Sequence, residues 1–72
     1  MERLPIDSSN IVSAGYNPVM QILEIEFKGG VVWQYAGFPE NMWYEFLSAP
    51  SQGKYFFAQI RPRFNDLGYR VQ

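Results

Sequence analysis

The chain has 72 residues, which is the size of one small domain, and its formal net charge of −1 argues against coating nucleic acid by bulk charge. It contains neither cysteine nor histidine, which excludes disulfides, thiolate metal sites and histidine general bases, so we expect no metal, no cofactor and no enzymatic activity. The apolar stretches are too short to cross a bilayer and no cationic start precedes an apolar run, so we expect a cytoplasmic protein without membrane contact.

The first half of the chain predicts the three strands of an antiparallel meander. The first strand covers residues 11–16 and ends at Asn17-Pro18, a pair that starts turns because Pro fixes φ and supplies no N–H. In the second, over residues 21–28, apolar and charged side chains alternate, which is typical of a strand buried on one face. The third strand follows the Gly29-Gly30 turn.

The length of this turn decides which face of the sheet Trp33 and Tyr35 occupy, because a shift of one residue reverses every side chain. A two-residue loop would place both rings among the charged side chains of the preceding strand. A three-residue loop with Gly30 in the left-handed position of a bulge sets Trp33 opposite Ile25 and Tyr35 opposite Leu23. Burial of several apolar side chains, at about 1.5 to 3 kcal/mol each, favours this second register. We therefore predict that both rings belong mostly to the core.

The same register places Glu24 and Glu26 together on the opposite face. Two carboxylates on one strand face could hold a hard cation or share acid and base roles. No further ligand accompanies them in the sequence, and a half-buried strand requires polar residues on its outer face in any case. We therefore interpret both glutamates as solvated surface.

Two short helices are predicted after the strands. Pro39 suits the first position of a helix because its fixed φ is already helical, and Pro50 stops this helix. Ser51 is a good N-cap for the second helix, and Pro62 ends it. The apolar faces consist of Phe38, Met42, Phe46 and Leu47 in the first helix and of Phe56, Phe57 and Ile60 in the second.

Together these elements predict a single α+β domain over residues 1–72. It consists of a three-stranded antiparallel β-meander followed by two short α-helices packed on one face. Tyr69-Arg70-Val71 also has the composition of a short C-terminal edge strand.

Basic charge is gathered at one end of the chain. Residues 51–72 carry four of the six cationic side chains but only one of the seven acidic ones. If these cations also lie together in space, they form a local anion site on a protein that is acidic overall.

The start of the second helix is the strongest candidate for such a site. At Ser51, Gly53 and Lys54, free N–H groups and the positive end of the helix dipole meet a positive charge, which suits a phosphate. Arg61 and Arg63 would extend the site, and Arg61 lies on roughly the same helix face as Lys54. The alternative is that Ser51 is only an N-cap, Gly53 permits tight packing and the basic side chains are solvated.

Aromatic rings form the second kind of candidate, since a base stacked on a ring contributes about 1 to 3 kcal/mol whatever its identity. The rings considered for stacking are Trp33, Tyr35, Tyr55 and Tyr69. For the first two, core packing is the favoured alternative. Trp43 and Tyr44 are less easily placed in the core and are candidates for a protein contact surface, because partners often bury these residue types.

Landmarks run through the chain in a fixed order: Ser8-Ser9, Leu23-x-Ile25-x-Phe27, Gly30, Trp33-x-Tyr35, Pro39, Ala49-x-Ser51-x-Gly53-x-Tyr55-Phe56 and Ile60-Arg61. In this order they resemble the KTSC family, named for a domain at the C-terminus of some lysyl-tRNA synthetases that also occurs as free-standing bacterial proteins. The resemblance covers about residues 6–64 and leaves 65–72 as a C-terminal extension. The family's central Tyr-x-Tyr is Trp33-Gln34-Tyr35 here, which keeps a flat aromatic at the first position but not a phenol.

What the resemblance implies about function is RNA binding. The leading hypothesis is therefore a non-enzymatic RNA-binding accessory module whose partner is tRNA or single-stranded RNA, held by the basic residues of the second helix. The alternative is a protein-interaction module, such as a homodimer, that uses Trp43, Tyr44 and an exposed strand edge. Salt distinguishes the two, since phosphate-driven binding weakens steeply with salt and burial of aromatics does not.

Overall fold

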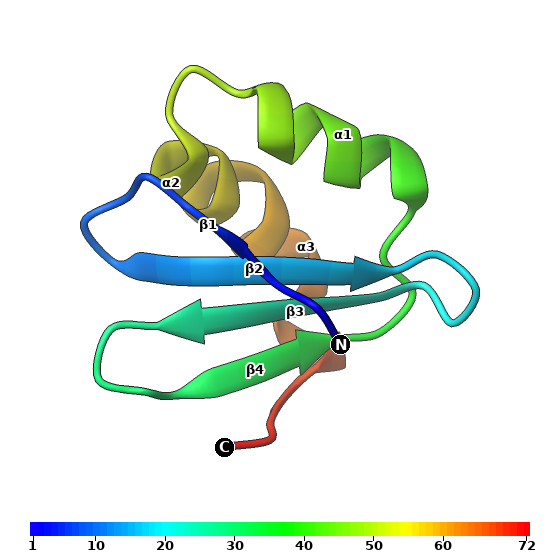
Figure 1. Cartoon of the computed structure of the whole chain (residues 1–72). Coiled ribbons are helices and arrows are strands. Elements are labelled where there is room, and N and C mark those ends of the chain that lie inside the picture. Colours follow the sequence, from blue (N-terminus) through cyan, green and yellow to red (C-terminus); the bar gives the residue numbers. More distant parts are fainter.

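The computed structural model describes all 72 residues and contains one antiparallel sheet whose five strands lie side by side in chain order. The strands are β1 (Leu4–Pro5), β2 (Ile11–Asn17), β3 (Ile22–Phe27), β4 (Val32–Tyr35) and β5 (Gly68–Arg70). Between β4 and β5 the chain forms α1 (Glu40–Ser48), α2 (Gln52–Tyr55), a π-helical turn η1 (Phe56–Ile60), α3 (Arg61–Phe64) and a 3₁₀ turn η2 (Asn65–Leu67). The helices lie on one side of the sheet (Figure 1).

The prediction of three strands was wrong, because the sheet has one further strand at each edge. β1 pairs Leu4 with Ala14 of β2 and is too short for its side chains to show an alternation. The predicted C-terminal strand does form, as β5. A Cβ atom on Gly68 would come within 2.5 Å of the ring of Tyr35, so only glycine lets β5 approach β4 at this point. The residues after 64 therefore complete the sheet.

The predicted register of the β3–β4 hairpin is confirmed. Ile25 lies opposite Trp33 and Leu23 opposite Tyr35. Gly30 has a φ of 84°, the left-handed conformation that the three-residue loop requires, and the N–H of Phe27 donates to the carbonyl of Val31 at 2.8 Å. Hydrophobic burial therefore selected the register, as the alternation of β3 indicated.

Of the three helix boundaries assigned to prolines, the end of α1 before Pro50 is confirmed, and the other two differ from the prediction. Pro39 is the N-cap of α1 rather than its first residue, because its ψ of 146° is extended. Pro62 does not end the second helix but lies in the first turn of α3. The π-helical turn before it sets Arg61 to donate its N–H to the carbonyl of Phe56, five residues back, and this wider turn carries the chain past a residue that has no N–H.

The core fills the space between the sheet and the helices. Its largest fully buried rings are Phe38, Phe46 and Phe56. Trp43, predicted as an exposed contact residue, is also buried, because its ring stacks on Tyr16 with centroids 5.7 Å apart. No helix of the chain is both long enough and apolar enough to cross a membrane.

Candidate functional site

A cleft of about 420 Å³ opens between the β3–β4 hairpin and the helical segment that runs from η1 to η2. Five aromatic side chains line it: Phe27, Trp33, Tyr35, Phe56 and Phe57. Lys28 and Arg61 add positive charge and no acidic residue borders the cleft. An apolar cleft with a few convergent polar groups is the usual form of a ligand site.

The hydroxyl of Tyr35 is the most informative group in this cleft. The side chain is only 5% exposed, and its hydroxyl makes no hydrogen bond within the protein. No fully buried side-chain oxygen lacks a partner, so this hydroxyl must reach solvent, and the cleft is the opening that Tyr35 borders. A nearly buried donor without a protein partner has its hydrogen-bonding capacity free for a ligand.

Arg61 supplies the charge beside this hydroxyl. Burial raises the pKa of the Tyr35 phenol above its ordinary value, whereas the positive charge of Arg61 opposes this shift by favouring the phenolate. The guanidinium lies 5.7 Å from the centroid of the Phe57 ring and forms no ion pair with any acidic residue. A cation held over an aromatic ring and left without a counter-ion suits a negatively charged, planar ligand.

Phe57 lies at the second position of the π-helical turn and lines the cleft. Its position in the sequence predicted burial on one face of a regular helix, but Phe57 is 37% exposed, while Phe56 and Ile60 are buried as predicted. Phe56 and Ile60 share one helix face, and Phe57 follows Phe56 by one residue, which turns its side chain away from that face. Phe57 therefore forms an exposed wall and not part of the core.

A second, polar hollow of about 460 Å³ lies next to the cleft. Asp7, Ser8 and Ser51 line it together with Gly53 and Lys54, so it includes the predicted anion-binding residues at the start of α2. Ser51 is the N-cap as predicted, accepting from the N–H of Lys54 at 3.3 Å. α2 itself has only four residues, so its N-terminus alone makes no site.

The predicted basic cluster is divided in the structure. Lys54 borders the polar hollow and Arg61 the aromatic cleft, because the π-helical turn lies between them and removes the common face that a regular helix would give. Arg63 borders neither opening. Gly53 serves packing, since a Cβ there would come within 2.7 Å of the Ser8 hydroxyl oxygen.

The aromatic candidates are also divided, because only some of them line the cleft. Trp33 and Tyr35 line the cleft, so being part of the core and facing a ligand site are compatible for these two rings. Tyr55 lies outside the cleft and donates its hydroxyl to Glu45 at 2.9 Å, and burial together with this carboxylate raises its pKa. Tyr44 and Tyr69 are exposed.

Comparison with known proteins agrees with this fold. The model of the KTSC domain family matches residues 7–64. The chain belongs to the KTSC domain family. A crystal structure of a KTSC domain protein from Yersinia pestis superimposes with a TM-score of 0.91 at 38% identity, covering 99% of this chain and 97% of that one.

Relatives of this KTSC domain occur in two settings. A protein of Tsukamurella paurometabola is 38% identical over 60 residues, which cover 83% of this chain and 90% of that protein. An uncharacterised protein of Stutzerimonas stutzeri is 36% identical over 63 residues, with 88% and 89% covered. A lysine–tRNA ligase of a Nostoc species is 34% identical over 58 residues, which cover 81% of this chain but 10% of the ligase.

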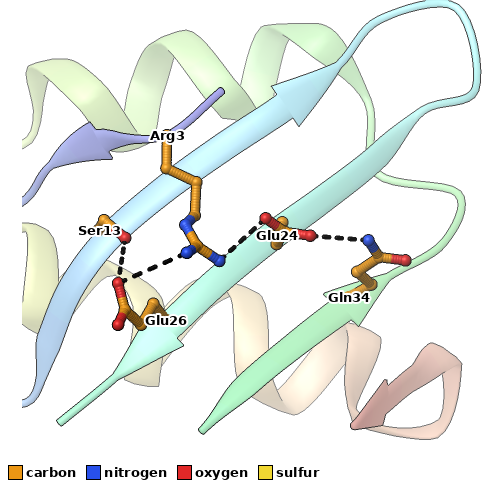
Figure 2. A network of polar contacts seen from close by, with 5 residues as sticks. All are labelled: Arg3, Ser13, Glu24, Glu26 and Gln34. Atoms are coloured by element: carbon orange, nitrogen blue, oxygen red, sulfur yellow. Dashed lines mark hydrogen bonds and ion pairs between the residues drawn. The ribbon is translucent and has the colours of Figure 1, made fainter. Parts of the chain in front are cut away.

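The opposite face of the KTSC sheet has a very different polar arrangement (Figure 2). Arg3 reaches across β2 to the carboxylates of Glu24, at 3.0 Å, and Glu26, at 3.8 Å. Ser13 donates to Glu26 at 2.8 Å, and the amide of Gln34 donates to Glu24 at 2.8 Å. The prediction that these glutamates are solvated was wrong for Glu24, which is 8% exposed because Arg3 covers it.

Gly15 of β2 makes room for this crossing. A Cβ atom at this position would come within 3.1 Å of Cγ of Arg3 and even closer to the backbone oxygen of Glu2. The arginine comes from the N-terminal segment, and the alternation of β3 does not predict its contact with Glu24. Only the pairing of β1 with β2 brings the two together.

Sequence reasoning missed the cleft residues Lys28, Phe57, Asn10 and Asn65 as members of a site. Asn10 and Lys28 meet because the N–H of Lys28 donates to the carbonyl of Asn10 at 3.0 Å, a contact between two loops. Ser8, by contrast, carried a signal, since it belongs to the first of the family landmarks. It lies opposite Gly53, which is another landmark of the same pattern.

Proposed function

We propose that this KTSC domain is a non-enzymatic RNA-binding accessory module that takes an unpaired base of single-stranded RNA, the single-stranded parts of tRNA included, into the aromatic cleft. The observation that carries the proposal is that the free hydroxyl of Tyr35 and the unpaired guanidinium of Arg61 line the same aromatic cleft. The rings supply a stacking surface for a base, and Arg61 and Lys28 supply charge for the phosphate next to it.

The unpaired cationic side chains favour a negatively charged ligand over a neutral one. Five of the six cationic side chains of the chain form no ion pair, since Arg3 makes both of the ion pairs present. Two of the five border the cleft, which has no acidic residue. The likeness to a stretch of a lysine–tRNA ligase is a further support by association, because that enzyme is named for an RNA substrate.

The alternative, a protein-interaction module, has less support. Its two proposed contact residues are separated by the fold, because Trp43 is 9% exposed in the core and only Tyr44, at 59%, remains on the surface. The edge strand β1 has two residues, which is a short template for pairing with another chain.

A titration of the domain with short single-stranded RNA at about 50 mM and about 200 mM salt tests the proposal. We expect binding that weakens at the higher salt and falls about tenfold or more in the Arg61→Ala variant, because a charge-assisted contact to phosphate is lost. Arg63→Ala is the matched control, since it removes the same charge outside the cleft. Equal losses in the two variants would assign binding to diffuse charge, and no binding at low salt would exclude the RNA function.

A further inference from the structure

The aromatic cleft and the polar hollow are neighbouring openings. Asn10 and Phe57 border both openings, so the two share a wall. Their volumes, about 420 and 460 Å³, each fall within the range of small-ligand sites. A nucleic-acid strand that places one base in the cleft therefore has the neighbouring nucleotide above the hollow.

The lining of the hollow is complementary to a sugar and a phosphate and not to a base. Of its eight lining residues only Phe57 is apolar, while Ser8, Ser9 and Ser51 bring hydroxyls. These groups both donate and accept hydrogen bonds, as ribose hydroxyls do.

Asp7 and Lys54 face this hollow with opposite charges and yet do not pair. The structure contains no ion pair between them, and the carboxylate of Asp7 accepts no hydrogen bond from any side chain or loop N–H. Each charge is thus free for a ligand. A carboxylate accepting from a ribose 2′-hydroxyl is a familiar arrangement, and an ammonium suits the adjoining phosphate.

The hollow is built by tertiary packing between the loop of residues 7–10 and the start of α2. The hydroxyl oxygen of Ser8 accepts from the N–H groups of Asn10 and Ile11, at 3.2 and 3.4 Å, which fixes the loop that carries Asp7. Gly53 lets α2 approach this serine closely. The distance between the two sides of the hollow is therefore set by the fold.

We infer that this hollow recognises the ribose 2′-hydroxyl of the nucleotide next to the stacked base, through the Asp7 carboxylate, so that the domain prefers RNA to DNA. The inference rests on the proposed function, because it needs a base in the cleft. The inference goes beyond the proposed function because it names the recognised group, the 2′-hydroxyl, and the residue that binds it, Asp7.

The test compares three single strands of one sequence containing only adenine and cytosine, so that the thymine methyl group is not a variable. They are RNA, DNA and 2′-O-methyl RNA, each titrated against the wild-type domain. We expect RNA to bind about tenfold tighter than the other two, because a hydrogen bond to a charged acceptor is lost in both.

The Asp7→Ala variant should reduce this ratio to about one while DNA affinity changes little. Glu40→Ala is the matched control, as it removes an exposed carboxylate from the first turn of α1, outside both openings, and should keep the ratio.

The outcomes separate the two proposals. Equal binding of RNA and DNA by the wild type, with a loss in Arg61→Ala, would overturn the reading of the ribose and keep RNA binding through the cleft. Equal weakening of RNA and DNA binding by Asp7→Ala would also overturn the reading of the ribose and keep RNA binding through the cleft. Binding of none of the three strands would overturn both proposals.

Discussion

The two faces of the sheet handle polar groups in opposite ways. On the open face, Arg3, Glu24 and Glu26 are joined by ion pairs, and Gln34 links Glu24 to the hydroxyl of Tyr69. On the helix side, Tyr35 has a free hydroxyl beside an unpaired cation. A network whose members hydrogen-bond to one another stabilises the fold, whereas groups in a cleft without a partner in the protein are free to bind a ligand.

The largest expected effect is on stability and concerns the open face. Arg3→Ala leaves the carboxylate of Glu24, 8% exposed, without its cation. We expect a loss of about 1 to 3 kcal/mol in the free energy of unfolding, reduced from the value for a fully buried pair because the side chain of Arg3 is 28% exposed. Urea denaturation measures it.

Arg63→Ala is the control for this substitution, since Arg63 is exposed and forms no ion pair. Its effect should stay within about 0.5 kcal/mol. Adding Glu24→Gln to Arg3→Ala should restore part of the loss, because the uncompensated charge is removed. A loss in Arg3→Ala no larger than in the control would show that the network does not stabilise the fold.

Two tyrosine hydroxyls differ in the same way, with a smaller expected effect. The hydroxyl of Tyr16 donates to the carbonyl of Phe38 at 2.5 Å, whereas that of Tyr35 has no partner. Tyr16→Phe should therefore lower the free energy of unfolding by about 1 kcal/mol, and Tyr35→Phe should change it by less than about 0.5 kcal/mol. Tyr35→Phe should instead weaken RNA binding roughly two- to tenfold. Equal destabilisation by the two substitutions would mean that the Tyr35 hydroxyl serves the fold.

The smallest effect is a change in the titration of Tyr35. Because its folded pKa is raised, mainly by burial, its contribution to stability is fully present below the ordinary pKa of 10 and is lost as the pH rises through the folded pKa. Removing the charge of Arg61 in Arg61→Ala should raise the pKa of Tyr35 further.

Absorbance of the tyrosinate, taken as the difference between each protein and its Tyr35→Phe partner, isolates this titration. Arg63→Ala should instead raise the pKa of Tyr55, whose phenolate Arg63 favours. An unchanged pKa of Tyr35 in Arg61→Ala would mean that the guanidinium does not lie beside the phenol.

The sequence alone predicted the family of this domain and several of its local features. Alternation in β3 and the glycines at 29 and 30 predicted the hairpin register, and Ser51 was recognised as an N-cap. These features depend on neighbours within a few residues, so the order of side chains carries them.

Tertiary structure decided which side chains meet. Arg3 covers Glu24 from 21 residues away, and Tyr35 shares a cleft with Arg61 because the helical segment folds back over the sheet. The π-helical turn before Pro62 separated Arg61 from Lys54, although their spacing predicted one face. Periodicity describes one element at a time, whereas a site between elements depends on how they pack, and the packing is set by burial of the whole core at once.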